Sequence, residues 1–497
     1  MSNIKDQLIR YMDAGFPILY LETFEETKAD AMIHSIAAGK NIVEWSINGF
    51  FDYGESAYMD WDLIQTLAYM VANPKDFERT VFVVKDAHQF LDDPAIKAEL
   101  KHLALKINEG LEEFTIILLS PIVNLPKELE NFTTLFTMGY LSPADIKDVI
   151  QSFCREQELD PLHETLLNDL VQTFKGLSES EIRGILALAL SDNGEITRSD
   201  LSLIFDQKQQ VIKKSGILEM IPLKESLEDI GGLESLKKWL KRKAKVFKNM
   251  PQAEAFGVDV PKGVLIAGMP GCGKSLNAKA AAKLFEVPLL RLDMGRLMGK
   301  YVGESEANMR KAIALAEAIS PCVLWIDELE KAFAGIGGEG GGADVTTRLF
   351  GTFLTWLQEK DSMAFVVATA NNIVKMPPEL LRKGRFDEIF YVDLPTEAER
   401  KKIFSIHIGK RRPTDLESID IAKLARETNG YSGADIEGVV RDSVEDAFAD
   451  GKEKLSTEDI QKAIKQTHSL SEIMKDSLEE MAKAYRDRKF KNASEGR

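Results

Sequence analysis

The sequence predicts an α/β protein with mainly parallel sheets, and three observations support this class. Short apolar segments alternate with helical segments along most of the 497 residues. Most apolar segments run directly into turn residues, as buried parallel strands do when helices cover both of their faces. A glycine-rich stretch lies between one such segment and a helix. The expected strands are 16–24, 41–48, 80–86 and 114–120 in the first half, and 263–268, 288–293, 322–327, 364–370 and 388–394 in the second.

The order of these segments predicts two α/β halves, each followed by helices. Strand patterns disappear after about residue 397, and a helical run at about 143–213 follows the strands of the first half. A polar, mixed stretch joins the two halves. The expected segments are an α/β domain at 1–140, its helical part at 141–205, a linker at 206–225, a second α/β core at 226–395, a helical domain at 396–465, and a C-terminal helix with its tail at 466–497.

Composition excludes several functional classes. The 63 Lys and Arg against 79 Asp and Glu give a net charge of −16, which disfavours a nucleic-acid partner. No apolar run approaches the roughly 20 residues of a membrane span, and the first residues lack the pattern of a secretory signal. The basic end "YRDRKFKNASEGR" is expected to be a solvated, frayed terminus. The odd, widely spaced cysteines indicate a reducing, cytoplasm-like compartment without a disulfide framework or a zinc site: Cys154, Cys272 and Cys322.

The stretch "GMPGCGKS" at 268–275 matches the phosphate-binding pattern G-x-x-x-x-G-K-[ST]. Its glycines let backbone N–H groups close around phosphate oxygens. Lys274 would neutralise β- and γ-phosphate charge, and Ser275 would ligate Mg²⁺ at the helix N-terminus. Cys272 is either a tolerated variant of a small residue or an oxidisable thiol. The residues expected to contact the nucleotide here are Gly268, Gly271, Cys272, Gly273, Lys274, Ser275 and Leu276.

Two other expected strands end in polar side chains. Asp327 ends one strand and would hold Mg²⁺, and the adjacent Glu328 would orient and polarise the attacking water. Asn371 follows the next expected strand, from where it would hold the water or the γ-phosphate. Taken alone, the two acids are also typical of helix caps. Beside a phosphate-binding loop they predict a nucleotide hydrolase with ATP and Mg²⁺ as cofactors.

The motif set over about residues 226–465 resembles that of AAA-family ATPases, with Walker A and Walker B segments in the family's order and spacing. The amino-acid sequences of these segments are most similar to those of the Ycf-type AAA proteins of plastids and cyanobacteria, with relatives in other bacteria. The segments are "DIGG" (229–232), "GMPGCGKS" (268–275), "KYVGESEANMRKA" (300–312), "WIDELEKAF" (325–333), "ATANN" (368–372), "LLRKGRFDEI" (380–389) and "GYSGADI" (430–436).

The resemblance implies an AAA core, a five-stranded parallel sheet between helices, with a helical lid at 396–465. It also implies a homo-oligomeric, hexameric ring in the cytoplasm or the plastid stroma that acts on a protein substrate. Arg382 and Arg385 resemble arginine fingers, which reach the ATP of a neighbouring subunit. The loop Lys300, Tyr301 and Val302 would line the central pore. The resemblance further places Ile230, Gly231, His407, Gly433 and Ala434 at the nucleotide.

The first half resembles a degenerate copy of the second. "KGLSESEIRGIL" (175–186) aligns without gaps with "NGYSGADIEGVV" (429–440), and two other segment pairs align in the same order. In this alignment Ala87 lies opposite Glu328, so the first half keeps Asp86 and loses the catalytic glutamate. The other substitutions are Ser120 opposite Asn371 and Asn131 opposite Arg382. The alternative is an unrelated α/β domain with a similar periodicity.

Two functional classes remain for the whole chain. One is an ATP-hydrolysing ring that remodels or translocates a protein, with one active site per chain. The other is a nucleotide-dependent switch or scaffold, in which slow hydrolysis only resets assembly. Turnover that a protein substrate stimulates would distinguish the first class from the second.

Overall fold

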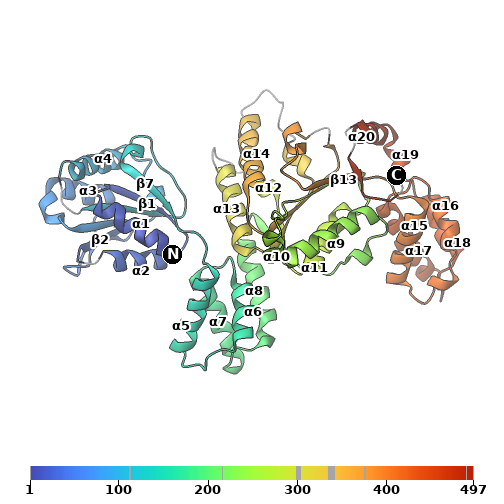
Figure 1. The fold of residues 1–497 in the computed structure, drawn as a ribbon, viewed down its shortest axis with the longest axis horizontal. Helices are drawn as coiled ribbons and strands as arrows, with labels where there is room; N and C mark the ends of the chain where they lie inside the picture. The colour runs from blue at the N-terminus through green and yellow to red at the C-terminus, as the bar shows by residue number, and fades with distance from the viewer. Residues whose placement is uncertain are drawn as a thin grey trace. The chain divides into compact units, whose positions relative to one another are not determined.

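The computed structural model describes residues 2–37, 39–110, 114–214, 216–297, 304–333, 342–373, 376–487 and 490–495. The chain divides into two compact units, Met1–Phe205 and Asp206–Arg497. In Figure 1 the first unit runs from blue to teal and the second from green to red. None of the helices in the described part of the chain has the length and apolar character needed to cross a membrane.

Unit 1 contains a seven-stranded sheet in the order β4-β3-β2-β5-β6-β1-β7. The five strands from β2 to β7 in this order are parallel, and β3 and β4 extend the sheet as antiparallel hairpins. The bounds are β1 (Ile18–Glu22), β2 (Asn41–Ser46), β3 (Gly49–Asp52), β4 (Ala57–Met59), β5 (Thr80–Val84), β6 (Thr115–Ser120) and β7 (Thr133–Thr137).

Helices cover both faces of this sheet because alternate strand residues point to opposite sides. On β1, Ile18 and Tyr20 belong to the core under α3 and α4, whereas Leu19 and Leu21 belong to the core under α1 and α2. The remaining helices follow the sheet. The bounds are α1 (Ser2–Asp13), α2 (Glu26–Ile36), α3 (Leu63–Ala72), α4 (Pro94–Asn108), α5 (Pro143–Glu156), α6 (Glu164–Phe174), α7 (Glu179–Asn193) and α8 (Leu201–Lys214).

Unit 2 contains a second seven-stranded sheet, in the order β14-β13-β9-β12-β11-β10-β8. The five strands from β13 to β10 in this order are parallel, as the family resemblance implies. The antiparallel β8 and the short parallel β14 extend the sheet at its two edges. The bounds are β8 (Leu218–Ile221), β9 (Gly263–Gly268), β10 (Leu289–Leu292), β11 (Cys322–Ile326), β12 (Ala364–Ala370), β13 (Glu388–Val392) and β14 (Lys491–Asn492).

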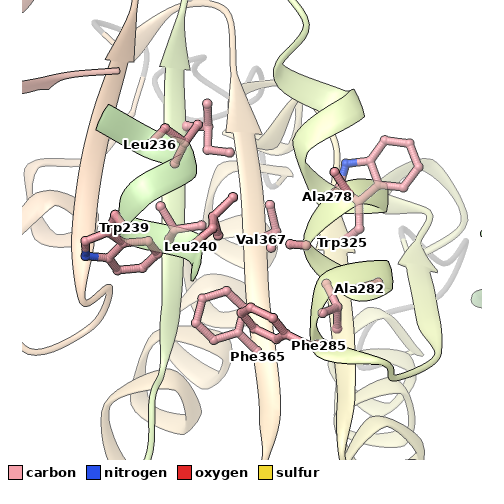
Figure 2. Packing of buried hydrophobic residues seen from close by; sticks show 14 of the residues in the cluster. Leu236, Trp239, Leu240, Ala278, Ala282, Phe285, Trp325, Phe365 and Val367 are labelled. Atoms are coloured by element: carbon pink, nitrogen blue, oxygen red, sulfur yellow. The ribbon is translucent and has the colours of Figure 1, made fainter. Parts of the chain in front are cut away.

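The main core of unit 2 lies between one face of this sheet and helices α9 and α11. Figure 2 shows Trp239 of α9 and Phe285 of α11 converging on Phe365 of β12. Ring centroids of Phe285 and Phe365 lie 5.1 Å apart in an edge-on arrangement, which aromatic rings favour. The helices on the sheet are α9 (Glu234–Lys248), α10 (Met250–Ala255), α11 (Lys274–Phe285), α12 (Met294–Leu297), α13 (Glu304–Ile319) and α14 (Gly342–Glu359).

The helical part that follows has its own core, made by α15 to α18. Each long helix begins at a capping box, such as Ser432 with Asp435 at α17, in which two side chains satisfy the free N–H groups of the first turn. The bounds are α15 (Glu397–Arg411), α16 (Ile421–Glu427), α17 (Gly433–Ala449), α18 (Thr457–Gln466), α19 (Leu470–Ile473) and α20 (Lys475–Asp487).

Some elements differ from the sequence-based expectations. The stretch 206–225, expected as a linker, holds the end of α8 and strand β8. Strands β3, β4, β7 and β14 were not expected. The expected frayed terminus is wrong for the part that is described, because Tyr485 is 2% exposed and Ala493 is fully buried.

Six strands of each sheet lie in the same spatial order. If β1 is matched to β9, the order β3-β2-β5-β6-β1-β7 of unit 1 corresponds strand by strand to β8-β10-β11-β12-β9-β13 of unit 2. β7 and β13 each pair in parallel with the strand beside them, β1 and β9, and β3 and β8 each pair antiparallel with β2 and β10; β4 and β14 have no counterpart in the other sheet. Unit 1 is therefore an AAA-like domain, as the weak internal repeat predicts.

Candidate functional site

The glycine-rich loop connects β9 to α11 at the carboxyl edge of the second sheet. Gly271 and Gly273 have φ angles of 71° and 79°, a left-handed conformation that glycine adopts without steric cost. A Cβ atom on Gly271 would lie 2.8 Å from the Ser432 hydroxyl, so the lid also leaves no room for a side chain there. The loop therefore needs glycine for both its conformation and its packing.

Lys274 is the first residue of α11 and is only 6% exposed. Its Nζ donates hydrogen bonds to the carbonyl oxygens of Gly268 at 3.0 Å and Met269 at 2.6 Å. Burial lowers the pKa of Lys274 to about 8, because the charged form loses hydration. An anion brought into this loop would restore the charged form, which is the property expected of a phosphate-binding lysine.

Cys272 lies in the same loop, beside Lys274. Burial raises the pKa of its thiol to about 12. Since the thiolate is the reactive form, this environment favours an inert side chain over an oxidisable one. Of the two interpretations of Cys272, the structure supports a tolerated variant of a small residue.

Ser275 and Asp327 form a pair of oxygen ligands at the end of the loop. The Ser275 hydroxyl donates to Asp327 Oδ1 at 3.0 Å. Thr369, which the sequence interpretation missed, donates to the same carboxylate oxygen. Hydroxyl and carboxylate oxygens are the donors that Mg²⁺ prefers, so this pair fits a magnesium ion bound together with nucleotide phosphates.

Glu328 and Asn371 lie together beside this pair, as expected. The Glu328 backbone is left-handed, with φ 51°, and its N–H donates to the Thr369 hydroxyl at 3.1 Å. The Asn371 side-chain amide donates to Glu328 Oε1 at 3.2 Å. Lys331 Nζ lies 2.5 Å from the other carboxylate oxygen. The Glu328 carboxylate is thus held by groups from two neighbouring strand ends.

Glu330 is a buried acid that the sequence interpretation also missed. Its Oε1 accepts the backbone N–H of Asn371 at 3.0 Å, and in the described part of the chain Oε2 has no hydrogen-bond partner. Burial raises the pKa of Glu330. Its position three residues after Asp327, on the turn that follows the strand, was the available signal.

These groups surround a cavity of about 450 Å³. The lid closes one side, where the Ala434 N–H donates to the Gly271 carbonyl at 2.9 Å. His407 also lines the cavity, and burial lowers its pKa. All the residues expected at the nucleotide line this cavity except Gly268, whose carbonyl accepts from Lys274: Ile230, Gly231, Gly271, Cys272, Gly273, Lys274, Ser275, Leu276, Asp327, Glu328, Asn371, His407, Gly433 and Ala434.

The expected arginine fingers do not line this cavity. The Arg382 side chain is 71% exposed, and its nearest carboxylate, that of Glu379, lies 3.9 Å away. Arg385 donates to the Glu379 carbonyl on the same surface turn. The expected pore residues Lys300, Tyr301 and Val302 lie outside the described residues.

The equivalent strand ends in unit 1 correct the sequence alignment by one residue. Lys85 follows β5 as Asp327 follows β11, and Asp86 has φ 50° where Glu328 has 51°. The expectation that Ala87 occupies the Glu328 position is therefore wrong. Unit 1 has an acid, Asp86, at the Glu328 position and a lysine, Lys85, at the Asp327 position.

The same one-residue shift applies to the next strand. The register between β5 and β6, compared with that between β11 and β12, places Pro121 opposite Asn371. The expectation that Ser120 is the counterpart of Asn371 is therefore also wrong. The side-chain amide that holds Glu328 has no counterpart at this position.

Charges at the unit 1 edge are the reverse of those in unit 2. Lys85 Nζ lies 3.0, 2.8 and 2.9 Å from the carboxylates of Glu26, Asp30 and Glu44. Burial acts to lower the pKa of Lys85, but the hydrogen bonds to these acids raise it above its ordinary value. The lysine at this edge already has three anionic partners, so it would not compensate a phosphate.

The loop before α2 is also too short to enclose phosphate. Only Thr23, Phe24 and Glu25 separate β1 from α2, whereas residues 269–273 separate β9 from α11. The Glu25 carboxylate accepts the Glu179 N–H at 2.9 Å, at the start of the lid-like helix α7. The carboxylate of Glu25 therefore occupies the N-terminus of α7, a position that otherwise favours an external anion.

Family models match most of the chain. Residues 264–394 match the ATPase family associated with various cellular activities (AAA), and residues 418–462 match an AAA+ lid domain. Residues 4–138 and 144–215 match the N-terminal and second domains of SpoVK-like AAA ATPases.

Full-length relatives support these matches. A protein of Pyropia yezoensis is 37% identical over 497 residues, which is 99% of this chain and 99% of the relative. One of Guillardia theta is 38% identical over 97% of this chain and 94% of the relative, and one of Trieres chinensis is 36% identical over 94% of both. Each is named uncharacterized AAA domain-containing protein ycf46.

The reversed charges of unit 1 predict a single nucleotide site per chain. Equilibrium titration with a nonhydrolysable ATP analogue should give one bound molecule per chain, and Lys274→Ala should give none, because the phosphate loses its cationic partner. Lys85→Ala serves as the matched control and should leave the stoichiometry at one. A site that survives in Lys274→Ala would contradict the prediction.

The lowered pKa of Lys274 predicts a pH-dependent affinity. Bound phosphate raises this pKa, so binding above the free-site pKa of about 8 must take up a proton. Affinity for the analogue should be nearly constant up to about pH 7 and should then fall, by up to about tenfold per pH unit above pH 8. Lys274→Arg, which stays charged, should bind without this decline, and a flat wild-type profile to about pH 9.5 would contradict the assignment.

Proposed function

The chain belongs to the AAA family of ATPases, together with the ycf46-type relatives, and from this premise we propose that it hydrolyses ATP to ADP and phosphate. The observation that carries the proposal is the meeting of three groups around one cavity. These are the buried cation Lys274, the oxygen pair Ser275–Asp327 and the hydrogen-bonded pair Glu328–Asn371. Among the described residues at the matching edge of unit 1, Asp86 at the Glu328 position has a counterpart in this constellation, whereas Lys85 lies at the Asp327 position and Pro121 at the Asn371 position.

Each group has a distinct role in the proposed reaction. The loop N–H groups and Lys274 bind and neutralise the phosphates. Ser275 and Asp327 would hold Mg²⁺, which would offset the negative charge of the phosphates. Glu328 accepts a hydrogen bond from the attacking water and aligns it with the terminal phosphorus. Asn371 fixes the Glu328 carboxylate, and its own amide faces the same cavity.

We further propose that the active form is a homo-oligomeric ring, hexameric by family analogy, that remodels or translocates a protein. The surface position of Arg382 and Arg385, away from their own chain's cavity, supports action on the ATP of a neighbouring subunit. A positively charged finger of this kind contributes roughly 10³ to 10⁵ in rate. Tyr301 would grip the substrate chain in the pore.

A glutamate variant tests the hydrolytic role. Glu328→Gln keeps the side-chain shape and removes the charge that aligns water, so it should bind ATP normally and lose at least about a hundredfold in turnover. Glu445→Gln, an exposed glutamate of α17, is the control and should match wild type. Normal turnover in Glu328→Gln would refute the assignment. Proteins that co-purify with this ATP-trapped variant, and not with Lys274→Ala, are candidate substrates.

Mixing variants tests the proposed finger. Arg385→Ala should bind ATP nearly as wild type and lose at least about a hundredfold in turnover, because the cation acts in the transition state. Mixing it with Lys274→Ala chains should restore part of the activity, since intact fingers then meet intact loops. Lys383→Ala changes an exposed cation on the same turn and should have little effect. Absence of rescue in demonstrated mixed assemblies would exclude a shared site.

A further inference from the structure

We propose that Tyr485, near the end of the chain, is a positioning residue for ATP hydrolysis and acts through Asn371. The inference rests on the proposed ATPase function and extends it to a segment outside the matched AAA core and lid regions, 264–394 and 418–462. Tyr485 lies on α20 and is 2% exposed, although the basic composition of the terminus predicts a solvated tail.

The Tyr485 side chain contacts both Asn371 and Tyr391. Its hydroxyl donates a hydrogen bond to the Asn371 backbone carbonyl at 3.3 Å. Its ring stacks on Tyr391 of β13, with centroids 4.4 Å apart and planes inclined by 25°. β13 also supports the phosphate-binding loop, because the Val392 carbonyl accepts the Met269 N–H at 2.9 Å. Tyr485 thus contacts Tyr391, which is adjacent to the loop-supporting Val392. It also contacts Asn371, which holds the Glu328 carboxylate.

Asn371 is held at three atoms. Its N–H donates to Glu330 at 3.0 Å, its carbonyl accepts from Tyr485, and its side-chain amide donates to Glu328 at 3.2 Å. The first two bonds fix the peptide groups on either side of the Asn371 Cα atom, and the third transmits that position to the Glu328 carboxylate. Loss of the Tyr485 hydroxyl frees the peptide group that follows the Asn371 Cα atom, so the side-chain amide of Asn371 is held less well against Glu328.

The chain beyond α20 is also hydrogen-bonded to the AAA core and to α15 of the lid. Ala493 donates to the Tyr391 carbonyl at 2.8 Å, and its own carbonyl accepts the Ser235 N–H at 3.0 Å at the start of α9. The Ser494 hydroxyl donates to Glu399 of α15 at 2.6 Å. These bonds and the complete burial of Ala493 anchor the far side of the segment. The chain that follows Tyr485 is therefore anchored to the AAA core.

Unit 1 provides an internal comparison. Its strand β7, which matches β13, is the last strand of its sheet, and Leu135 on it is 49% exposed. In unit 1 the carbonyl of Ile122, in the loop after β6, accepts a hydrogen bond from Tyr20 of β1 at 2.8 Å. In each unit a tyrosine hydroxyl thus donates to a carbonyl in the loop after the matched strand, β6 or β12. The donor is Tyr20 of β1 in unit 1 and Tyr485, near the end of the chain, in unit 2.

The test compares Tyr485→Phe with Tyr20→Phe. Both remove one buried hydroxyl from a loop carbonyl and keep the ring. Tyr485→Phe should lower kcat about fivefold, the effect of one hydrogen bond, and leave KM and analogue affinity unchanged, because Asn371 acts on the hydrolytic step. Tyr20→Phe should leave kcat unchanged. A wild-type kcat in Tyr485→Phe, or an equal loss in Tyr20→Phe, would overturn the proposal.

Amide hydrogen exchange provides a readout that does not depend on turnover. Exchange across 364–373 should be faster in Tyr485→Phe than in wild type, with unit 1 peptides unchanged. Unchanged exchange there would also overturn the proposal. If the wild-type chain binds the analogue but does not hydrolyse ATP, the proposed function fails by itself, and the exchange experiment still decides whether Tyr485 holds Asn371.

Discussion

The burial of a lysine at the carboxyl edge of a parallel sheet is the constraint on which the catalytic unit depends. Among the residues that the structure describes, Lys274 Nζ has two hydrogen-bond acceptors, both backbone carbonyls, and burial lowers the pKa of Lys274 because the charged form lacks full compensation. The site is therefore incomplete as an electrostatic assembly until an anion enters. The surrounding structure serves this requirement: glycines allow the loop to close, and the parallel strands bring the acids to the same edge.

The two units show how one topology supports opposite electrostatics. Six matched strands have the same order in both sheets, and both sheets have a left-handed residue two positions after the matched strands β5 and β11. In unit 2 the helix side contributes the cation and the strand end contributes the acid. In unit 1 Lys85 is on the strand end and Glu26 and Asp30 are on the helix, so the ionic groups satisfy one another. The fold is retained in both units, whereas the groups needed for the chemistry are present in one.

The sequence was sufficient for the parts of the structure that local patterns determine. Strands 263–268 and 364–370 were predicted at their observed bounds, because apolar runs end in turn residues. The loop between β9 and α11 was predicted because its glycine pattern reflects a backbone requirement. The unit 1 alignment failed by one residue at Asp86, since short segments do not reveal where a strand ends. Thr369 and Glu330 were missed because their roles come from contacts between neighbouring strand ends.

The C-terminal segment shows most clearly why the composition of a segment does not predict which of its residues are buried. Its basic residues predict solvation, but solvation of those side chains is compatible with burial of the residues between them. Tyr485 and Ala493 are buried in the protein, while Lys491 forms an ion pair with Glu388 at the surface of the sheet edge. A short strand at this edge pairs with β13 and so covers backbone groups that would otherwise be exposed. Because β13 also supports the phosphate-binding loop, the same contacts that close the sheet edge hold one side of the catalytic site. Stability of this edge and geometry of the site are therefore coupled through a single strand.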